Sequence, residues 1–269
     1  MSTVEIQSRR NLPDQLGIVG VGAIAEAIIT GLCEGDDPPA AIHLSARSAE
    51  RANRLAARYS SVHVADSNQS VVERADVVLL CVRPEDARGA LSKVAFSARH
   101  AVISVMAGIT IDSLRLLVAP AEVLVRAIPL PAVARRTGLT AIHPEHELVR
   151  AIFEPLGGVI AVDGERALDA LSASTATIAA HLAYLETVSR WLADRGIPPT
   201  DATRYVAAVF GSLAGTLLGA STSDFGTLAD EYATAGGINE QFLAALRRAG
   251  VFDIVEHALD DVALRLEGE

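Results

Sequence analysis

An apolar strand that turns through glycines directly into a helix, over residues 16–25, constrains the fold of this chain more than any other stretch. Gly20 permits a tight turn, Gly22 removes the Cβ that would keep a ligand away from the backbone, and Ala25 lets the helix pack closely on the strand. The helix predicted over 23–34 begins at Ala23 and Ile24, and its free N–H groups and positive dipole end attract an anion. The turn is typical of a site for a dinucleotide pyrophosphate.

The surroundings of the glycine turn separate this interpretation from an ordinary structural turn, which the same pattern also fits. A second strand, 41–45, begins where a strand–helix–strand unit should return, and it ends in Ser45-Ala46-Arg47-Ser48. An NAD site places Asp or Glu there, whereas Arg47 can grip a 2′-phosphate bidentately and the two serines add donors. The sequence therefore predicts NADP in preference to NAD. In the alternative interpretation, Arg47 is a solvated loop arginine and Ser48 caps a helix over 49–58.

Composition limits the partners of the chain. Half of the 269 residues are hydrophobic and the net charge is −10, which indicates a well-cored protein and argues against binding to nucleic acid or anionic membranes. Charged residues or glycines interrupt every apolar stretch before it could cross a bilayer, so we expect a cytoplasmic protein. Cys33 and Cys81 have the apolar context of buried thiols, so no metal site is expected, and residues 1–11 read as a mobile tail.

Strands and helices alternate from residue 12 to 163, which predicts a doubly wound, mostly parallel Rossmann-like sheet that binds NADP. The apolar strand 76–81 should be central and end at Val82, Arg83 and Pro84, at the sheet edge where such folds place ligands. Arg83 could face the nicotinamide ribose or a substrate anion, or it could be a surface arginine. A strand over 101–104 exits at the same edge through residues small enough to admit a nicotinamide ring: Ser104, Ala107 and Gly108.

From residue 164 to 269 the pattern is helical only. One long helix is predicted over 165–195, and the next, over 201–220, is apolar on nearly every side. A segment of this size cannot bury so much apolar surface alone, so we expect an all-α dimerisation and substrate domain and a homodimer or a higher multiple of dimers. A monomer that buries the second helix in its own interior is the alternative.

Taken in order, these segments resemble the pyrroline-5-carboxylate reductase family. The glycine turn looks like its nucleotide loop, and residues 45–48 stand where it reads the 2′-phosphate. Residues 80–84 are similar to its A-V-K-P strand end, residues 104–110 to its S-x-x-A-G-V-T, and residues 126–129 to its R-x-M-P. The resemblance implies reduction of a cyclic imine to proline.

The resemblance also implies a substrate-binding loop near the C-terminus, where the family has S-P-G-G-T-T. Here the loop reads Thr234-Ala235-Gly236-Gly237-Ile238-Asn239. Backbone N–H groups of Gly236 and Gly237 would hold a substrate carboxylate, and Thr234 and Asn239 would add hydrogen bonds; a plain turn with a helix cap is the alternative. Ile238 replaces a threonine of the family pattern and Leu130 replaces its asparagine, and these departures favour a changed acceptor.

Hydride transfer to a C=N bond asks the protein mainly for alignment. His181 is the one histidine of the helical half considered as a proton donor, although such a residue is more often part of an interface; Glu186 and Glu240 read as solvated helix positions. We expect an NADPH-dependent reductase of a small cyclic imino acid, by default pyrroline-5-carboxylate. Three alternatives stay open: a reductase of another imine, a coenzyme F420-dependent NADP oxidoreductase, and a non-catalytic NADP-binding regulator.

Overall fold

The computed structural model describes residues 12–219 and 224–267, so the predicted tail 1–11 lies outside the described residues. The chain divides into two compact units. The first runs to Ser172 and includes the end of the chain from Arg265, and the second comprises Ala173–Leu264. The sequence places the boundary at 163/164 instead, so most of the first helix of the predicted helical domain lies in the first unit.

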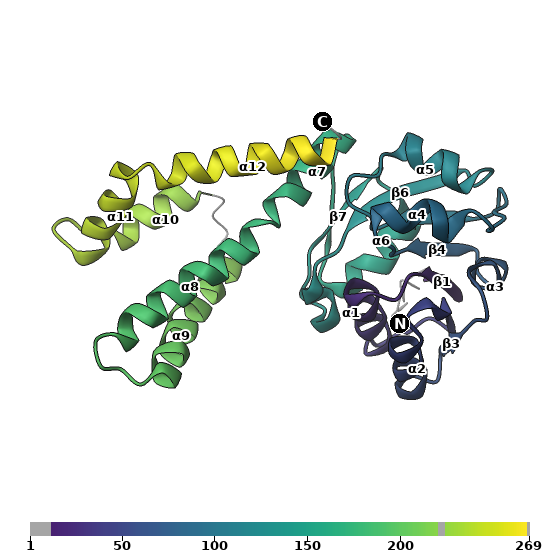
Figure 1. Cartoon of the computed structure of the whole chain (residues 1–269), viewed down its shortest axis with the longest axis horizontal. Helices are drawn as coiled ribbons and strands as arrows, with labels where there is room; N and C mark the ends of the chain where they lie inside the picture. Colours follow the sequence, from purple (N-terminus) through teal and green to yellow (C-terminus); the bar gives the residue numbers. More distant parts are fainter. Residues whose placement is uncertain (1–11, 220–223, 268–269) are drawn as a thin grey trace, which may run out of the picture. The chain divides into compact units, whose positions relative to one another are not determined.

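The first unit is built on an eight-stranded sheet in the order β3-β2-β1-β4-β5-β6-β7-β8 (Figure 1). Every neighbouring pair is parallel except β6 and β7, so the predicted doubly wound sheet is confirmed with one antiparallel step. Strand β1 is flanked by β2 and β4, with Ile18 opposite both Leu44 and Leu79. The strands are β1 (Gln15–Val19), β2 (Ala41–Leu44), β3 (Val62–Val64), β4 (Val77–Leu80), β5 (Ala101–Ser104), β6 (Val123–Ile128), β7 (Thr140–His143) and β8 (Val159–Ala161).

Helices cover both faces of this sheet. One apolar core joins α1, α2 and α6 to the sheet, and a second core joins α3, α4 and α5 to it. The helices and 3₁₀ turns are α1 (Ala23–Cys33), η1 (Ala46–Ser48), α2 (Ala49–Arg58), α3 (Asn68–Glu73), α4 (Pro84–Leu91), α5 (Ile111–Val118), η2 (Pro131–Arg135), α6 (Glu147–Phe153), η3 (Glu154–Leu156) and α7 (Glu165–Ser174).

Strand β4 shows why this sheet is central. All four of its residues are buried, with Leu79 in one core and Val78 and Leu80 in the other. Successive side chains of a strand point to opposite faces, so a continuous apolar run fits a strand covered on both sides. Side-chain caps help to fix the helix starts: Ser67 accepts from the N–H of Ser70 at α3, and Thr110 accepts from Ser113 at α5.

The second unit is helical, as expected. It contains α8 (Thr177–Ala193), α9 (Pro199–Gly219), α10 (Phe225–Tyr232), α11 (Ile238–Arg248) and most of α12 (Val251–Glu267), and α8 packs along α9. The prediction of one helix over 165–195 is wrong, because the chain turns at residues 175–176 between α7 and α8. There the Thr177 hydroxyl donates to the Ser174 carbonyl at 2.7 Å, a local bond that competes with the helical ladder.

The surfaces of α8 and α9 remain strongly apolar in the single chain. Trp191 and Leu182 on α8 are 53% and 61% exposed, and Tyr205 on α9 is 65% exposed. Large apolar side chains exposed on two helices that pack together are typical of a protein interface. No helix among the described residues combines the length and apolar character that a membrane crossing requires.

Candidate functional site

The glycine turn has the geometry that a pyrophosphate site needs. Gly20 has φ +95°, and a Cβ on it would lie 2.7 Å from the Cys81 carbonyl oxygen at the end of β4. Gly22 is the N-cap of α1, no side chain caps it there, and a Cβ on it would meet open space. Ala25 is fully buried. Gly20 is therefore required by packing, whereas Gly22 leaves the first turn of α1, with Ala23 exposed and Ile24 half-buried, approachable by an anion.

Ser45 has a different position from the one predicted. Its side chain is only 1% exposed, and its hydroxyl accepts a hydrogen bond from the Gly20 N–H at 2.8 Å. Ser45, directly after β2, thus holds the backbone of the glycine turn in place. A hydroxyl buried in this way does not match the predicted role of Ser45 as a donor to the 2′-phosphate. Ser48 is exposed and occupies the N-cap of α2, but its side chain makes no cap hydrogen bond, contrary to the capping alternative.

Arg47 and Arg83 are brought together by a residue that the sequence did not single out. Asp86, in the first turn of α4, lies 3.3 Å from Nη2 of Arg47 and 3.1 Å from Nη2 of Arg83. Hydrogen bonding to Arg47 lowers the pKa of Asp86; burial opposes this, and Arg83 adds to the lowering. Pro84 is at the first position of α4, where its missing N–H costs nothing. No sequence signal marked Asp86, because its contact with Arg47 joins the segments that follow two different strands, β2 and β4.

Arg51 was also missed as a site residue. Its Nε lies 2.9 Å from Glu26 of α1, and its Nη1 donates to the Val21 carbonyl at 3.4 Å. The guanidinium therefore supports the backbone of the glycine turn from α2. The half-buried Val82 would touch any side chain at Gly20, since its Cγ1 lies 2.7 Å from the Cβ position.

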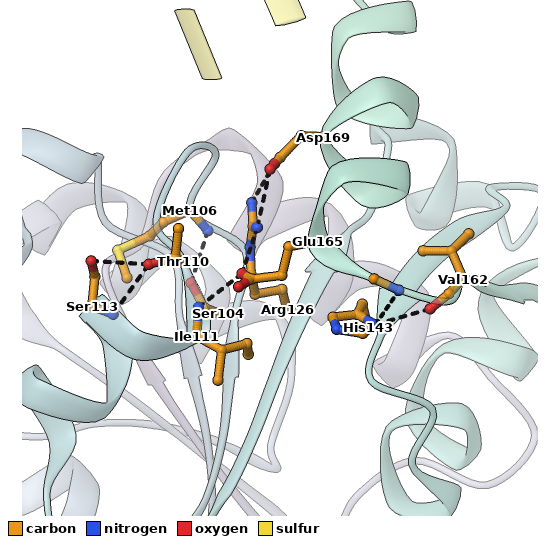
Figure 2. A network of polar contacts seen from close by, with 11 residues as sticks. Ser104, Met106, Thr110, Ile111, Ser113, Arg126, His143, Val162, Glu165 and Asp169 are labelled. Carbon is orange, nitrogen blue, oxygen red and sulfur yellow. Dashed lines mark hydrogen bonds and ion pairs between the residues drawn. The ribbon is translucent and has the colours of Figure 1, made fainter. Parts of the chain in front are cut away.

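The exit of β5 lies at the same edge of the sheet. Ser104 is 1% exposed and accepts from the Met106 N–H at 3.3 Å, so its hydroxyl shapes the loop from inside (Figure 2). Ala107 is exposed, and Gly108 has φ +70°, with Leu266 near its Cβ position. Of the three residues predicted to face a nicotinamide, Ala107 and Gly108 reach the surface of the loop, whereas Ser104 is buried beneath it.

A buried ion-pair network lies beside this loop (Figure 2). Arg126 of β6, 2% exposed, donates to Asp169 at 2.6 Å and to Glu165 at 2.8 Å, and Glu165 also accepts from the Ile111 N–H. Burial lowers the pKa of Arg126, and the bonds to Asp169 and Glu165 outweigh it, so the net shift is upward. The network attaches α7 to the sheet and to the start of α5.

The diglycine loop of the second unit is engaged internally. Gly236, with φ +73°, donates its N–H to the Glu240 carboxylate at 2.7 Å, and Gly237 donates to the Thr234 carbonyl at 2.8 Å. Asn239 donates its amide to the Tyr232 carbonyl at 3.0 Å. In this structure both glycine N–H groups already have acceptors, so a substrate carboxylate would have to compete with them. Glu240, in the first turn of α11, reaches back to occupy the Gly236 N–H, and the Thr234 carbonyl occupies that of Gly237.

Two other predicted residues of the second unit have simple surroundings. Ile238 is 84% exposed at the start of α11, where no side chain caps the helix. His181 on α8 is exposed and packs beside two rings, with centroid distances of 6.3 Å to Tyr184 and 5.9 Å to Phe210 of α9. His181 therefore belongs to an aromatic cluster that joins α8 and α9.

The parallel sheet, the open glycine turn and the helical second unit define a class: Rossmann-fold oxidoreductases with an α-helical C-terminal domain. Residues 15–108 match the family described as "NADP oxidoreductase coenzyme F420-dependent", and residues 165–268 match "Pyrroline-5-carboxylate reductase dimerisation". Pyrroline-5-carboxylate reductase of Synechocystis sp. is 31% identical over 192 residues, covering 68% of this chain and 70% of the relative. The chain belongs to the pyrroline-5-carboxylate reductase family.

Further relatives extend the similarity over nearly the whole chain. Pyrroline-5-carboxylate reductase 2 of Bacillus subtilis is 26% identical over 262 residues, or 93% of each protein. The solved 1-pyrroline-5-carboxylate reductase of Streptococcus pyogenes superposes with a TM-score of 0.81 at 25% identity, over 95% of this chain and 98% of that chain. A reductive aminase from Aspergillus terreus, solved in complex with NADPH, shares the fold, with a TM-score of 0.60 at 16% identity over 96% of this chain and 92% of that one.

Proposed function

We propose that this protein is an NADPH-dependent reductase of a small cyclic imino acid, with pyrroline-5-carboxylate as the default substrate and proline as the product. The observation that carries the proposal is the glycine turn, which is closed to side chains at Gly20 and open to an anion at Gly22. Membership of the family supports the substrate class, since the relatives are named for this activity. The reductive aminase that shares this fold was solved in complex with NADPH, which supports the coenzyme.

The described residues divide the binding of NADPH into parts. The first turn of α1 would hold the pyrophosphate through backbone N–H groups and the helix dipole. Arg47 and Ser48 would contact the 2′-phosphate, since both are exposed at the carboxyl end of β2. The small residues that follow β5 would leave room for the nicotinamide. When bound, that ring supplies the hydride, and the protein aligns the acceptor and excludes water.

Binding of the acceptor is assigned to the start of α11. The first turn of this helix carries no side-chain cap; Thr234 precedes it with a hydroxyl, and the Asn239 amide, which donates to the Tyr232 carbonyl in this structure, lies within it. An imino-acid carboxylate would have to displace Glu240 from the Gly236 N–H. His181 remains a proposed proton donor, and the alternative is that its ring serves only the aromatic cluster on α8 and α9.

A second candidate keeps the reaction and changes the acceptor to an imine without a carboxylate. The observation that favours it is the Glu240 carboxylate on the Gly236 N–H, together with the exposed apolar Ile238 beside it. A carboxylate already in the loop repels an anionic acceptor and suits a neutral or cationic imine.

The assay is the oxidation of NADPH, followed by its absorbance, with pyrroline-5-carboxylate and with an unsubstituted cyclic imine. Turnover of the imino acid supports the main proposal, and turnover of the unsubstituted imine alone supports the second candidate. NADPH binding without turnover of either would favour a regulator, and turnover only with coenzyme F420 would favour an F420-dependent oxidoreductase.

The preference for NADPH over NADH is tested by a variant of Arg47. Arg47→Ala should raise the KM for NADPH roughly tenfold, the loss of one charge-assisted phosphate contact, and leave the KM for NADH unchanged. Arg99→Ala is the matched control, because Arg99 is an exposed arginine that precedes β5 and pairs with Asp76 at the opposite edge of the sheet. An unchanged NADPH preference in Arg47→Ala would remove Arg47 from the site.

We also propose that the protein is a homodimer or a multiple of dimers formed through the second unit. The exposed apolar side chains of α8 and α9 and the match to a dimerisation family support this. Light scattering coupled to size exclusion at micromolar concentration measures the mass directly, and a monomer would contradict the proposal.

A further inference from the structure

Two arginines from opposite sides of the glycine turn share one carboxylate. Arg47 follows β2 and Arg83 follows β4, and these two strands flank β1. Asp86 receives Arg47 on Oδ1, at 3.3 Å, and Arg83 on Oδ2, at 3.2 Å from Nε and 3.1 Å from Nη2. The two guanidinium groups therefore converge on a single small anion at the edge of the sheet that holds the glycine turn.

This ion pair is exposed and exchangeable. The side chains of Arg47 and Arg83 are 62% and 72% exposed, and Asp86 is 25% exposed. Exposed ion pairs contribute little to folding stability, so the bridge is not needed to hold α4 in place. Arg47 contacts Asp86 through one nitrogen only, which leaves its other N–H donors for a ligand.

The charge balance shows what the bridge does to an incoming phosphate. Two arginines would present two positive charges, but Asp86 cancels one of them, and Glu85 lies 3.4 Å from Nη1 of Arg83. A phosphate group carries more negative charge than a carboxylate and binds guanidinium groups through several oxygens. It can therefore take the place of Asp86, but it must first compete with it.

We propose that Asp86 is a specificity-determining residue, an internal anion that occupies the arginine pair Arg47 and Arg83 until the 2′-phosphate of NADPH replaces it. This inference rests on the proposed NADPH-dependent function and deepens it in two ways. It assigns Arg83 to the 2′-phosphate instead of the nicotinamide ribose. It also makes Asp86 the residue that limits the preference for NADPH over NADH.

The test compares dissociation constants for NADPH and NADH, measured by calorimetry at low salt, in the wild type, Asp86→Asn and Glu85→Gln. Asp86→Asn should bind NADPH roughly fivefold more tightly, because one like charge a few ångströms away is removed, and should bind NADH within about twofold of the wild type. Added salt should shrink the gain. Glu85→Gln is the comparison variant: Glu85 pairs with Arg83 but does not contact Arg47, so its removal should tighten NADPH binding less than Asp86→Asn does.

Arg83→Gln is the last variant of the test. It should weaken the binding of NADPH several-fold more than the binding of NADH. Weaker NADPH binding in Asp86→Asn would mean that Asp86 only orients the arginines, and equal changes for both coenzymes would place Asp86 at the shared part of the dinucleotide. Either result overturns the inference. So does a dissociation constant for NADPH that is the same in Asp86→Asn as in the wild type, provided that the wild type binds NADPH. A wild type that binds neither coenzyme refutes the proposed function itself.

Discussion

Loss of the Arg126 charge should destabilise the first unit strongly, and more than the loss of an arginine from a solvated ion pair does. Arg126→Met keeps most of the side-chain volume but leaves Asp169, which is 5% exposed, without its cationic partner. Breaking a buried ion pair from one side costs about 3–5 kcal/mol, since the remaining charge stays desolvated. For a protein of this size, that loss lowers the Tm by on the order of 10 °C.

Urea unfolding followed by circular dichroism, and thermal scans at fixed protein concentration, measure this loss. Arg126→Met with Asp169→Leu should recover most of the stability, because an apolar pair of similar volume replaces a buried ion pair at little net cost. Arg150→Met is the control, since the Arg150 side chain is 40% exposed where that of Arg126 is 3% exposed, and its ion pairs with Glu145 and Glu154 are solvated. The Tm of this variant should stay close to that of the wild type. The reasoning is refuted if Arg126→Met is no more harmful than the control, or if the double variant is as unstable as the single one.

Three further predictions follow from the site and the core. Gly20→Ala should lower the free energy of unfolding by about 1–3 kcal/mol and remove most of the NADPH affinity, because φ +95° and the nearby Cys81 carbonyl force the turn to move. Thermal scans measure the first effect and calorimetry the second, and an unchanged Tm would contradict the packing argument. Burial, then His63 and Arg74, lower the pKa of His43, so its stabilising contribution is present above about pH 6.5 and is lost as the pH falls through the lower folded-state pKa. His43→Leu should flatten this part of a stability–pH curve, and an equally steep curve would exclude His43 as the cause. Glu240→Ala should lower the KM for pyrroline-5-carboxylate several-fold by freeing the Gly236 N–H, and an unchanged KM would separate that loop from carboxylate binding.

The sequence was sufficient for the elements and the nucleotide turn because local patterns determine them. The apolar run of β4 and the glycine spacing after β1 each depend on neighbouring residues, and both lie where predicted. The antiparallel step between β6 and β7 could not be read in this way, because strand direction depends on how the intervening segment crosses the sheet. The turn between α7 and α8 arises from a threonine hydroxyl that competes for a carbonyl, a choice that the helical pattern does not reveal.

The polar contacts of the site show the same difference between what neighbouring residues determine and what they do not. Residue types predicted that Ser45 and Arg47 would lie at the end of β2, but not that Ser45 would turn inward to Gly20 while Arg47 turned toward Asp86. These outcomes depend on what lies 25 and 39 residues away along the chain. Glu240 is exposed as expected, but its carboxylate accepts from the Gly236 N–H four residues earlier, a local contact that the helical pattern did not indicate.

The attachment of α7 to the sheet decides where this chain can be divided for expression. A recombinant fragment that stops at residue 163 would lack both Glu165 and Asp169 and would leave the Arg126 guanidinium without either carboxylate, next to newly uncovered apolar surface. A fragment that stops at Ser172 keeps both acids and the whole N-terminal segment of the first compact unit, and lacks only the segment from Arg265 that completes this unit. Crystallisation or ligand-screening work on the nucleotide-binding half should therefore start from the longer fragment.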